Sequence, residues 1–152
     1  MDWFELCYNF LARSDIEGEV LTAYLDTGGV WTIGVGHTGP VDGKKIGKST
    51  KITPEKSREL LKEDIKQAAE AVDTLVHTKR PLTAHQKAAL VSFIFNIGRN
   101  AFAGSTMLRL LNSNQFDAAA LQFARWNMDN GVVLRGLINR RAYEKQMFLT
   151  AD

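Results

Sequence analysis

Residues 17–37 read EGEVLTAYLDTGGVWTIGVGH. Two runs rich in β-branched and aromatic residues, 20–25 and 30–35, lie on either side of a Thr27-Gly28-Gly29 turn. Runs of this kind joined by a glycine-rich turn predict a short antiparallel β-hairpin. A small sheet is therefore expected directly after the first helix of the chain.

Three polar side chains belong to this unit. Glu17 lies at the expected end of the preceding helix, Asp26 at the end of the first strand, and Thr32 on the second. Facing one cleft, two carboxyl groups and a hydroxyl are the minimum set for hydrolysing a glycosidic bond: one acid protonates the leaving oxygen while the other groups activate water. A structural interpretation stays open at this point, because Asp-x-x-Gly turns and glutamates at helix ends are common motifs.

The rest of the chain predicts helices. Thr53-Pro54 is a cap residue followed by proline, and it begins a long, mostly polar helix to about residue 77, typical of a helix that bridges two lobes. A capping box at Thr83 and Gln86 begins a helix over 84–97 that is apolar nearly all round, as expected of a buried core helix. Further helices are predicted at 3–16, 106–111, 115–126 and 136–149, with a turn at 129–131.

These elements predict an α+β fold that is mainly α, in one domain over residues 1–152. A small β lobe is expected at about 14–53 and a connecting helix at about 54–77. A helical lobe is expected at about 78–152, joined by the N-terminal helix. A chain of this length can bury a sizeable core.

Composition excludes several classes of protein. The chain is 45% hydrophobic and 24% charged, which is ordinary for a globular domain and excludes disorder. No apolar stretch approaches the roughly 20 residues needed to span a bilayer, and the first five residues carry Asp2 and Glu5 without a basic region, so neither a membrane anchor nor a signal peptide is expected. Cys7 is the single cysteine, so no internal disulfide can form.

No cofactor, metal or nucleic acid is expected as a partner. Gly34-Val35-Gly36-His37-Thr38-Gly39 matches a dinucleotide-binding pattern, but no helix follows it to hold a pyrophosphate. The three histidines are scattered, and with one cysteine they cannot assemble a zinc site. The Arg125-Trp126 and Arg140-Arg141 pairs do not alternate with exposed aromatic residues as a nucleic-acid platform would.

The charge is unevenly distributed along the chain. The net charge is +2, but residues 1–78 hold 9 Lys and Arg against 13 Asp and Glu, and residues 79–152 hold 10 against 4. The two halves therefore carry −4 and +6. A basic half suggests an anionic partner such as the bacterial cell wall, although a solvated face would have the same composition.

The motifs taken together resemble the phage-type lysozymes, or endolysins, of glycoside hydrolase family 24. The resemblance rests on Glu17-Gly18, on Tyr24-Leu25-Asp26 nine residues after that glutamate, and on Thr32-Ile33-Gly34-Val35-Gly36-His37. It continues through Asp64, the 89–98 segment, Arg125-Trp126 and the 136–144 segment, and so covers residues 10–149. It implies a lysozyme-like bilobal fold.

The resemblance also implies roles for individual residues. Glu17 would be the general acid, and Asp26 and Thr32 would hold the attacking water in an inverting reaction. His37 and Asp64 would form a structural ion pair. Arg140 would pair with Glu17, although the adjacent Arg141 could take that place. For the sugar, the matching positions are Phe95, Asn96, Thr38 and Gln122.

The function that follows is hydrolysis of the β-1,4 bond between N-acetylmuramic acid and N-acetylglucosamine in peptidoglycan, for host cell lysis. The alternatives are a non-catalytic lysozyme-like module that binds the cell wall, and a transglycosylase or chitinase-like activity on a related polymer. A monomer is expected, without stable membrane association. We expect it to stay in the host cytoplasm until a separate holin releases it to the wall, in agreement with the absence of disulfides.

Overall fold

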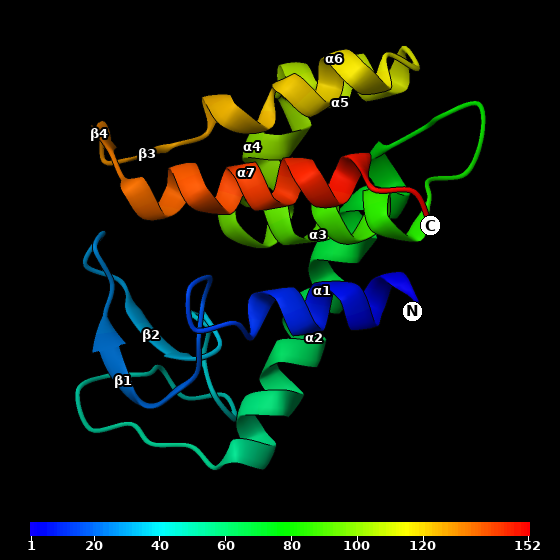
Figure 1. The fold of residues 1–152 in the computed structure, drawn as a ribbon. Helices are drawn as coiled ribbons and strands as arrows, with labels where there is room; N and C mark the ends of the chain where they lie inside the picture. Colours follow the sequence, from blue (N-terminus) through cyan, green and yellow to red (C-terminus); the bar gives the residue numbers. More distant parts are fainter.

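The computed structural model describes residues 1–152 as a mainly helical fold with two small antiparallel sheets. Figure 1 shows the β1–β2 hairpin and the loop after it at one end of the molecule, with most of the helices gathered at the other. The long helix α2 runs from the hairpin end into the helical part. The predicted fold class, α+β and mainly α, is confirmed.

The first sheet pairs β1 (Val20–Leu25) with β2 (Trp31–Gly34) in antiparallel register, with Tyr24 opposite Thr32. Asp26 follows β1 directly, and its Oδ1 accepts hydrogen bonds from the backbone N–H groups of Gly28 and Val30, at 2.9 and 2.8 Å. This short polar side chain therefore fixes the turn that the two strands need.

Helices α2 (Pro54–Leu75) and α3 (Ala84–Ile97) begin as their sequences predict. The Thr53 hydroxyl caps α2 by accepting from Lys56 N–H at 3.1 Å, and the Thr83–Gln86 capping box is present at the start of α3. Helix α3 lies at the centre of the core and contacts α1 (Trp3–Leu11), α2 and α7 (Arg135–Leu149). Its long apolar surface explains why it is buried on several sides.

The remaining elements are short. They are α4 (Arg99–Ala103), α5 (Thr106–Asn112), α6 (Phe116–Leu121), the 3-10 helix η1 (Phe123–Arg125), β3 (Met128–Asp129) and β4 (Val132–Val133). The helix predicted at 115–126 is thus interrupted at Gln122, which ends α6 and precedes η1. Helix α4 was not predicted, because Gly98, with a φ of 90°, ends α3 and at the same residue begins α4.

The first helix is shorter than the predicted range of 3–16. It ends at Leu11 rather than at residue 16, and turns follow as far as Glu17. The N–H of Gly18 bonds to the carbonyl of Arg13 at 2.9 Å, and Gly18 takes a φ of 67°. Glu17 therefore lies in a tight turn beyond the helix, not at the helix end.

No helix combines the length and the apolar character required to cross a bilayer. No group of three or more His, Cys, Asp and Glu side chains is placed to hold a metal ion.

Candidate active site

A cleft of about 710 Å³ lies where the hairpin meets the helical part of the molecule. Its walls come from segments far apart in the sequence: the turn before β1, the end of β1, the end of α3, the β3 region and the start of α7. Glu17 and Asp26 both line it, together with Asn96 and Arg140. The structure therefore brings the two predicted catalytic carboxyl groups to one cavity.

Glu17 is held by close packing and by an ion pair. Its side chain is 18% exposed, and its Oε1 accepts a short hydrogen bond from Nη1 of Arg140. Gly36 lies so near that a Cβ there would come within 2.6 Å of Oε2 of Glu17 and within 3.2 Å of Phe95. Gly36 also has a φ of +66°, so glycine is required both by the backbone and by the position of Glu17.

Only one of the two carboxylate oxygens of Asp26 is engaged by the protein. Because Oδ1 is bound by two backbone N–H groups of the turn, the carboxylate cannot rotate freely, and Oδ2 has no partner within the protein. Burial, and then the nearby charges of Glu17 and Asp26, raise the pKa of the Tyr24 phenol. Tyr24 also lines the cleft.

Thr32 is buried on β2. It pairs with Tyr24 of β1, which lies two residues before Asp26. Its side chain faces the interior and its hydroxyl donates to the carbonyl of Val30 at 3.0 Å. It is absent from the lining of the cleft that holds Glu17 and Asp26. This hydroxyl therefore braces the strand that follows the Asp26 turn.

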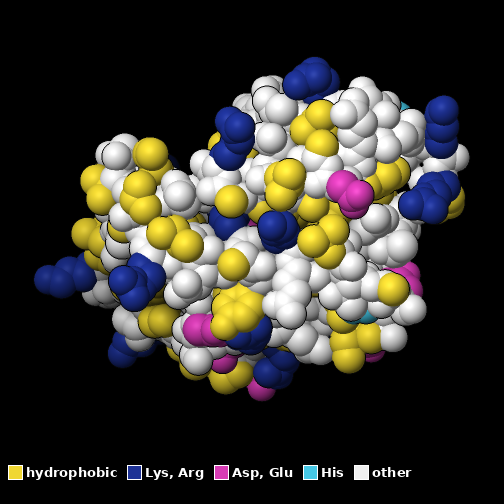
Figure 2. Space-filling model, turned by 45° about the horizontal axis from the view of Figure 1, so that its top comes forward, with side chains coloured by type: hydrophobic (Ala, Val, Ile, Leu, Met, Phe, Trp, Pro, Cys, Tyr) yellow, Lys and Arg dark blue, Asp and Glu magenta, His cyan; other side chains and the backbone are white.

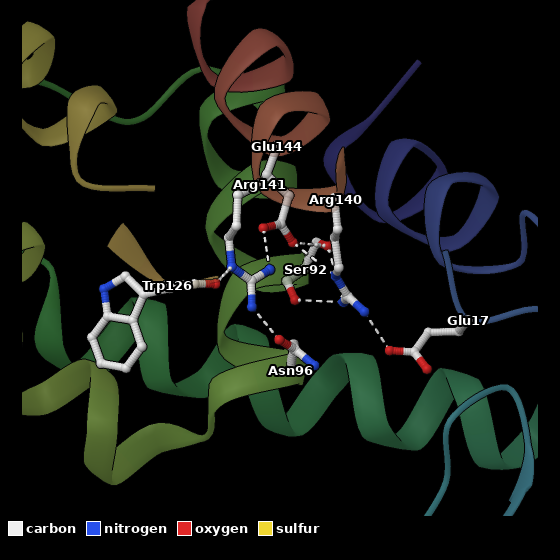
Figure 3. A network of polar contacts seen from close by, with 7 residues as sticks. All are labelled: Glu17, Ser92, Asn96, Trp126, Arg140, Arg141 and Glu144. Carbon is white, nitrogen blue, oxygen red and sulfur yellow. Dashed lines mark hydrogen bonds and ion pairs between the residues drawn. The ribbon is translucent and has the colours of Figure 1, made fainter. Parts of the chain in front are cut away.

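A network of buried charges lies behind the cleft (Figure 3). Glu144, which is fully buried, accepts from Nε of Arg140 at 3.2 Å, from Nη1 of Arg141 at 2.6 Å and from Ser92 Oγ at 2.6 Å. Arg140 thus bridges Glu144 and Glu17. Arg141 instead contacts Asn96 and the Trp126 carbonyl, so Arg140, not Arg141, pairs with Glu17.

The protonation of the two arginines follows from this arrangement. Burial alone lowers the pKa of Arg140, but the charges and hydrogen bonds of Glu144 and Glu17 outweigh it and raise that pKa. Burial lowers the pKa of Arg141, with Glu144 acting against it. Elsewhere, burial raises the pKa of the Cys7 thiol to about 12, so this thiol stays protonated and unreactive.

The second predicted pair joins the hairpin segment to α2. Nδ1 of His37 lies 2.7 Å from Oδ2 of Asp64, and Nε2 lies 3.2 Å from the carbonyl of Pro40. The hydrogen bond to Asp64 is the main reason that the pKa of His37 is raised, although burial opposes it. His37 and Asp64 line a second cavity of about 570 Å³.

Gly36 and Phe95 line this second cavity, and Gly36 lies directly against Glu17, which lines the first. Thr38 and Phe95 line the second cavity, so two of the predicted sugar-binding residues lie on this side of Glu17, while Asn96 lies on the other. Gln122 is half-buried at the end of α6 and lines neither cavity.

The sequence does not predict the part of the cleft wall that β3 and the residues beside it supply. The Thr27 hydroxyl, at the tip of the first hairpin, donates to Oδ2 of Asp129 at 2.5 Å, and Trp126 and Asp129 both line the cleft. Asn130-Gly131, both with positive φ, is the two-residue turn that signals a β-hairpin, although only a turn was predicted there.

Comparison with known proteins adds to this geometry. A family model described as phage lysozyme matches residues 14–144. The chain belongs to the phage lysozyme family. It is 49% identical over 134 residues to an endolysin of Salmonella phage P22, covering 88% of this chain and 90% of the relative.

Two solved structures share the fold of this family member. A crystal structure of a P22 lysozyme variant superposes with a TM-score of 0.77 at 46% identity and covers 95% of each chain. The muramidase domain of SpmX from Asticaccaulis excentricus superposes with a TM-score of 0.78 at 40% identity, covering 98% of this chain and 95% of that one. The lysozyme-like fold expected from the sequence is therefore confirmed.

Proposed function

We propose that this chain is an endolysin that hydrolyses the β-1,4 bond between N-acetylmuramic acid and N-acetylglucosamine in bacterial peptidoglycan. The observation that carries the proposal is that Glu17 and Asp26 line a single cleft in a chain of the phage lysozyme family. Its relatives include proteins named endolysin and muramidase.

The proposed reaction inverts the anomeric carbon. Glu17 donates a proton to the leaving glycosidic oxygen as the bond to the anomeric carbon breaks. Asp26, whose Oδ2 is free of protein partners, holds a water on the opposite face of the sugar and takes its proton as the new bond forms. Thr32 supports this water indirectly, because its hydrogen bond to the Val30 carbonyl braces the strand that follows the Asp26 turn.

The proposed glycan path runs across both cavities. Phe95 and Thr38 contact the sugars on one side of Glu17, and Asn96 contacts them on the other. Gln122 lines neither cavity and is left out of this path. The other two contacts have structural roles. The His37–Asp64 pair joins the hairpin lobe to α2, and Arg140 holds Glu17 in place.

The setting of the reaction is also a proposal. Phage endolysins act on the cell wall, and we propose that this single-domain monomer remains in the host cytoplasm until a holin gives it access to the peptidoglycan. The basic half of the chain, with a net charge of +6, suits the anionic wall.

Replacement of Glu17 by Gln tests the function. Glu17→Gln keeps the size and the hydrogen bond to Arg140 but removes the acid, so clearing of a suspension of purified cell walls is expected to fall by a factor of at least about 10². Glu19→Gln, two residues away, retains an acceptor for Ser57 and serves as the matched control with nearly full activity. Thermal unfolding checks that both variants fold.

Two outcomes would overturn the assignment. Wall clearing retained by Glu17→Gln would show that another group is the acid. Wall binding without clearing by the unmodified protein would make the chain a binding module. Mass spectrometry of the released fragments separates hydrolysis, which leaves reducing ends, from transglycosylation, which leaves anhydro ends.

A further inference from the structure

Each of the three guanidinium nitrogens of Arg141 donates a hydrogen bond, two of them to residues that line the cleft. Arg141 is 2% exposed. Nε donates to the Trp126 carbonyl at 2.9 Å, Nη1 donates to Glu144 at 2.6 Å, and Nη2 donates to Oδ1 of Asn96. Its guanidinium carbon also lies 5.0 Å from the centre of the Phe93 ring. A side chain held at so many points has one orientation.

This contact fixes the polarity of the Asn96 amide. Arginine has only donors, so the group that meets Nη2 must be the amide oxygen of Asn96. The amide nitrogen then points away from Arg141, as Figure 3 shows, and it has no acceptor within the protein. Because Asn96 is exposed and lines the cleft with Glu17, the cleft receives an NH₂ group that can only donate.

We infer that Asn96 donates a hydrogen bond to the acetamido carbonyl of an amino sugar in the cleft, and that Arg141 is the positioning residue that presents this donor. The inference rests on the proposed function. A donor of fixed polarity can bond to the acetamido carbonyl, which always accepts, but not to the ammonium group left when the acetyl group is removed, because that group can only donate. Asn96 and Arg141 therefore select N-acetylated glycan.

Two substitutions at Asn96 separate the donor from the rest of the side chain. Asn96→Ala removes the amide. Asn96→Asp keeps an oxygen for Arg141 but replaces the donor by a second oxygen. Binding is measured by calorimetry with soluble peptidoglycan strands, N-acetylated and chemically de-N-acetylated, all in the Glu17→Gln background so that the strand is not cut.

The two strands are expected to respond differently. Each Asn96 substitution weakens binding of the N-acetylated strand by about fivefold to tenfold, the effect of one hydrogen bond. Asn96→Ala leaves binding of the de-N-acetylated strand unchanged, because that strand has already lost the acetamido carbonyl that would accept the hydrogen bond. Asn96→Asp tightens it, because a free ammonium then meets a carboxylate.

Arg141→Lys tests the positioning role. Lysine keeps a positive charge beside Glu144 but cannot make three divergent hydrogen bonds. It is expected to weaken binding of the N-acetylated strand alone, and to add nothing once Asn96→Ala is present. If Arg141 had a merely structural role, Arg141→Lys would weaken binding of both strands by the same factor, and its effect would add to that of Asn96→Ala.

Failure of the acetamido inference can be distinguished from failure of the proposed hydrolysis. Equal weakening of both strands by Asn96→Ala overturns the acetamido assignment, whether or not the unmodified protein clears walls. Failure of the unmodified protein to clear walls overturns the proposed hydrolysis and leaves the strand difference intact. Should Arg141→Lys fail to fold, the two Asn96 variants still decide whether the donor reads the acetamido group.

Discussion

At the scale of single residues, the most unusual feature is the burial of charges behind the cleft. Arg140, Arg141 and Glu144 are 4%, 2% and 0% exposed, and with Glu17 they make two positive and two negative groups. Removing one partner from such a set costs about 3–5 kcal/mol, because the charge left behind is buried without compensation. Adjacent arginines and a glutamate on a polar helix give no sign of burial in the sequence, so only the family resemblance predicted that one of them meets Glu17.

The pair of His37 and Asp64 allows a prediction of pH dependence. The pKa of His37 is raised above its ordinary 6.5, so the charged pair contributes fully below about pH 6.5 and loses this contribution as the pH rises through the raised pKa. Asp64→Asn is therefore expected to lower the free energy of unfolding by about 1.5–3 kcal/mol near pH 5.5, and by less near pH 9.

Chemical denaturation at the two pH values measures this difference. Asp73→Asn is the matched control, because Asp73 on the same helix pairs at 2.9 Å with Lys87, which stays charged over this range. Its effect on the free energy of unfolding should not change with pH. A loss for Asp64→Asn that is equal at both pH values would show that His37 does not change its charge between them.

At the scale of elements, local signals predicted the helices and strands wherever caps and periodicity agree. Helix α3 has the predicted bounds because its capping box and apolar surface specify the same start and length. At the first helix the apolar spacing ends at Leu11, and the helix ends there too, so the predicted extension to residue 16 is wrong. The lost turn matters for function, since it places Glu17 in a tight loop beside Gly36 rather than on a helix.

Gly36 provides a prediction at this scale. A Cβ at Gly36 would come within 2.6 Å of Oε2 of Glu17, and alanine at its φ of +66° costs about 1–2 kcal/mol of stability. Gly36→Ala must displace the flexible end of Glu17, so wall clearing is expected to fall by about a factor of 10², as a small misplacement of a catalytic group does. The measurements are wall clearing and thermal unfolding.

Gly43→Ala is the control that isolates the effect on Glu17. Gly43 has a φ of +77°, and no atom lies within 4 Å of its added Cβ, so this variant shares the backbone strain without the collision. The two variants should lose similar stability, and only Gly36→Ala should lose activity. Equal activities would mean that Glu17 adapts to the new methyl group without loss.

At the scale of the whole molecule, the cleft is assembled from parts that no local pattern connects. Glu17, Asn96, Trp126 and Arg140 come from four separate segments, and the two hairpin tips meet through Thr27 and Asp129, which are 102 residues apart. Spacing within a motif placed Glu17 and Asp26 together because both flank one strand. It could not place Trp126 or Asp129, whose positions depend on how the helices pack. Gln122 was assigned to the sugar site from the family resemblance, and it lines neither cavity.

The distribution of charge over the molecule leads to the last prediction. The exposed cations of the helical half are Lys79, Arg80, Arg99, Arg109, Arg125 and Arg135. Figure 2 shows Lys and Arg side chains spread over its face rather than gathered in one patch. Such a field attracts an anionic polymer over long range and is screened by salt, whose screening length falls from about 30 Å at 0.01 M to about 8 Å at 0.15 M. Wall clearing is therefore expected to slow by roughly tenfold between these concentrations.

A pair of charge reversals shows whether the helical half is responsible. Arg109→Glu with Arg125→Glu, and Lys44→Glu with Lys45→Glu in the acidic half, change the net charge equally, and all four side chains are exposed. The first double variant should clear walls more slowly at low salt and lose most of its salt dependence. The second should keep the clearing rate and the salt dependence of the unmodified protein. Equal losses would mean that net charge alone governs the approach to the wall, and no salt dependence in the unmodified protein would mean that its encounter with the wall is not electrostatic.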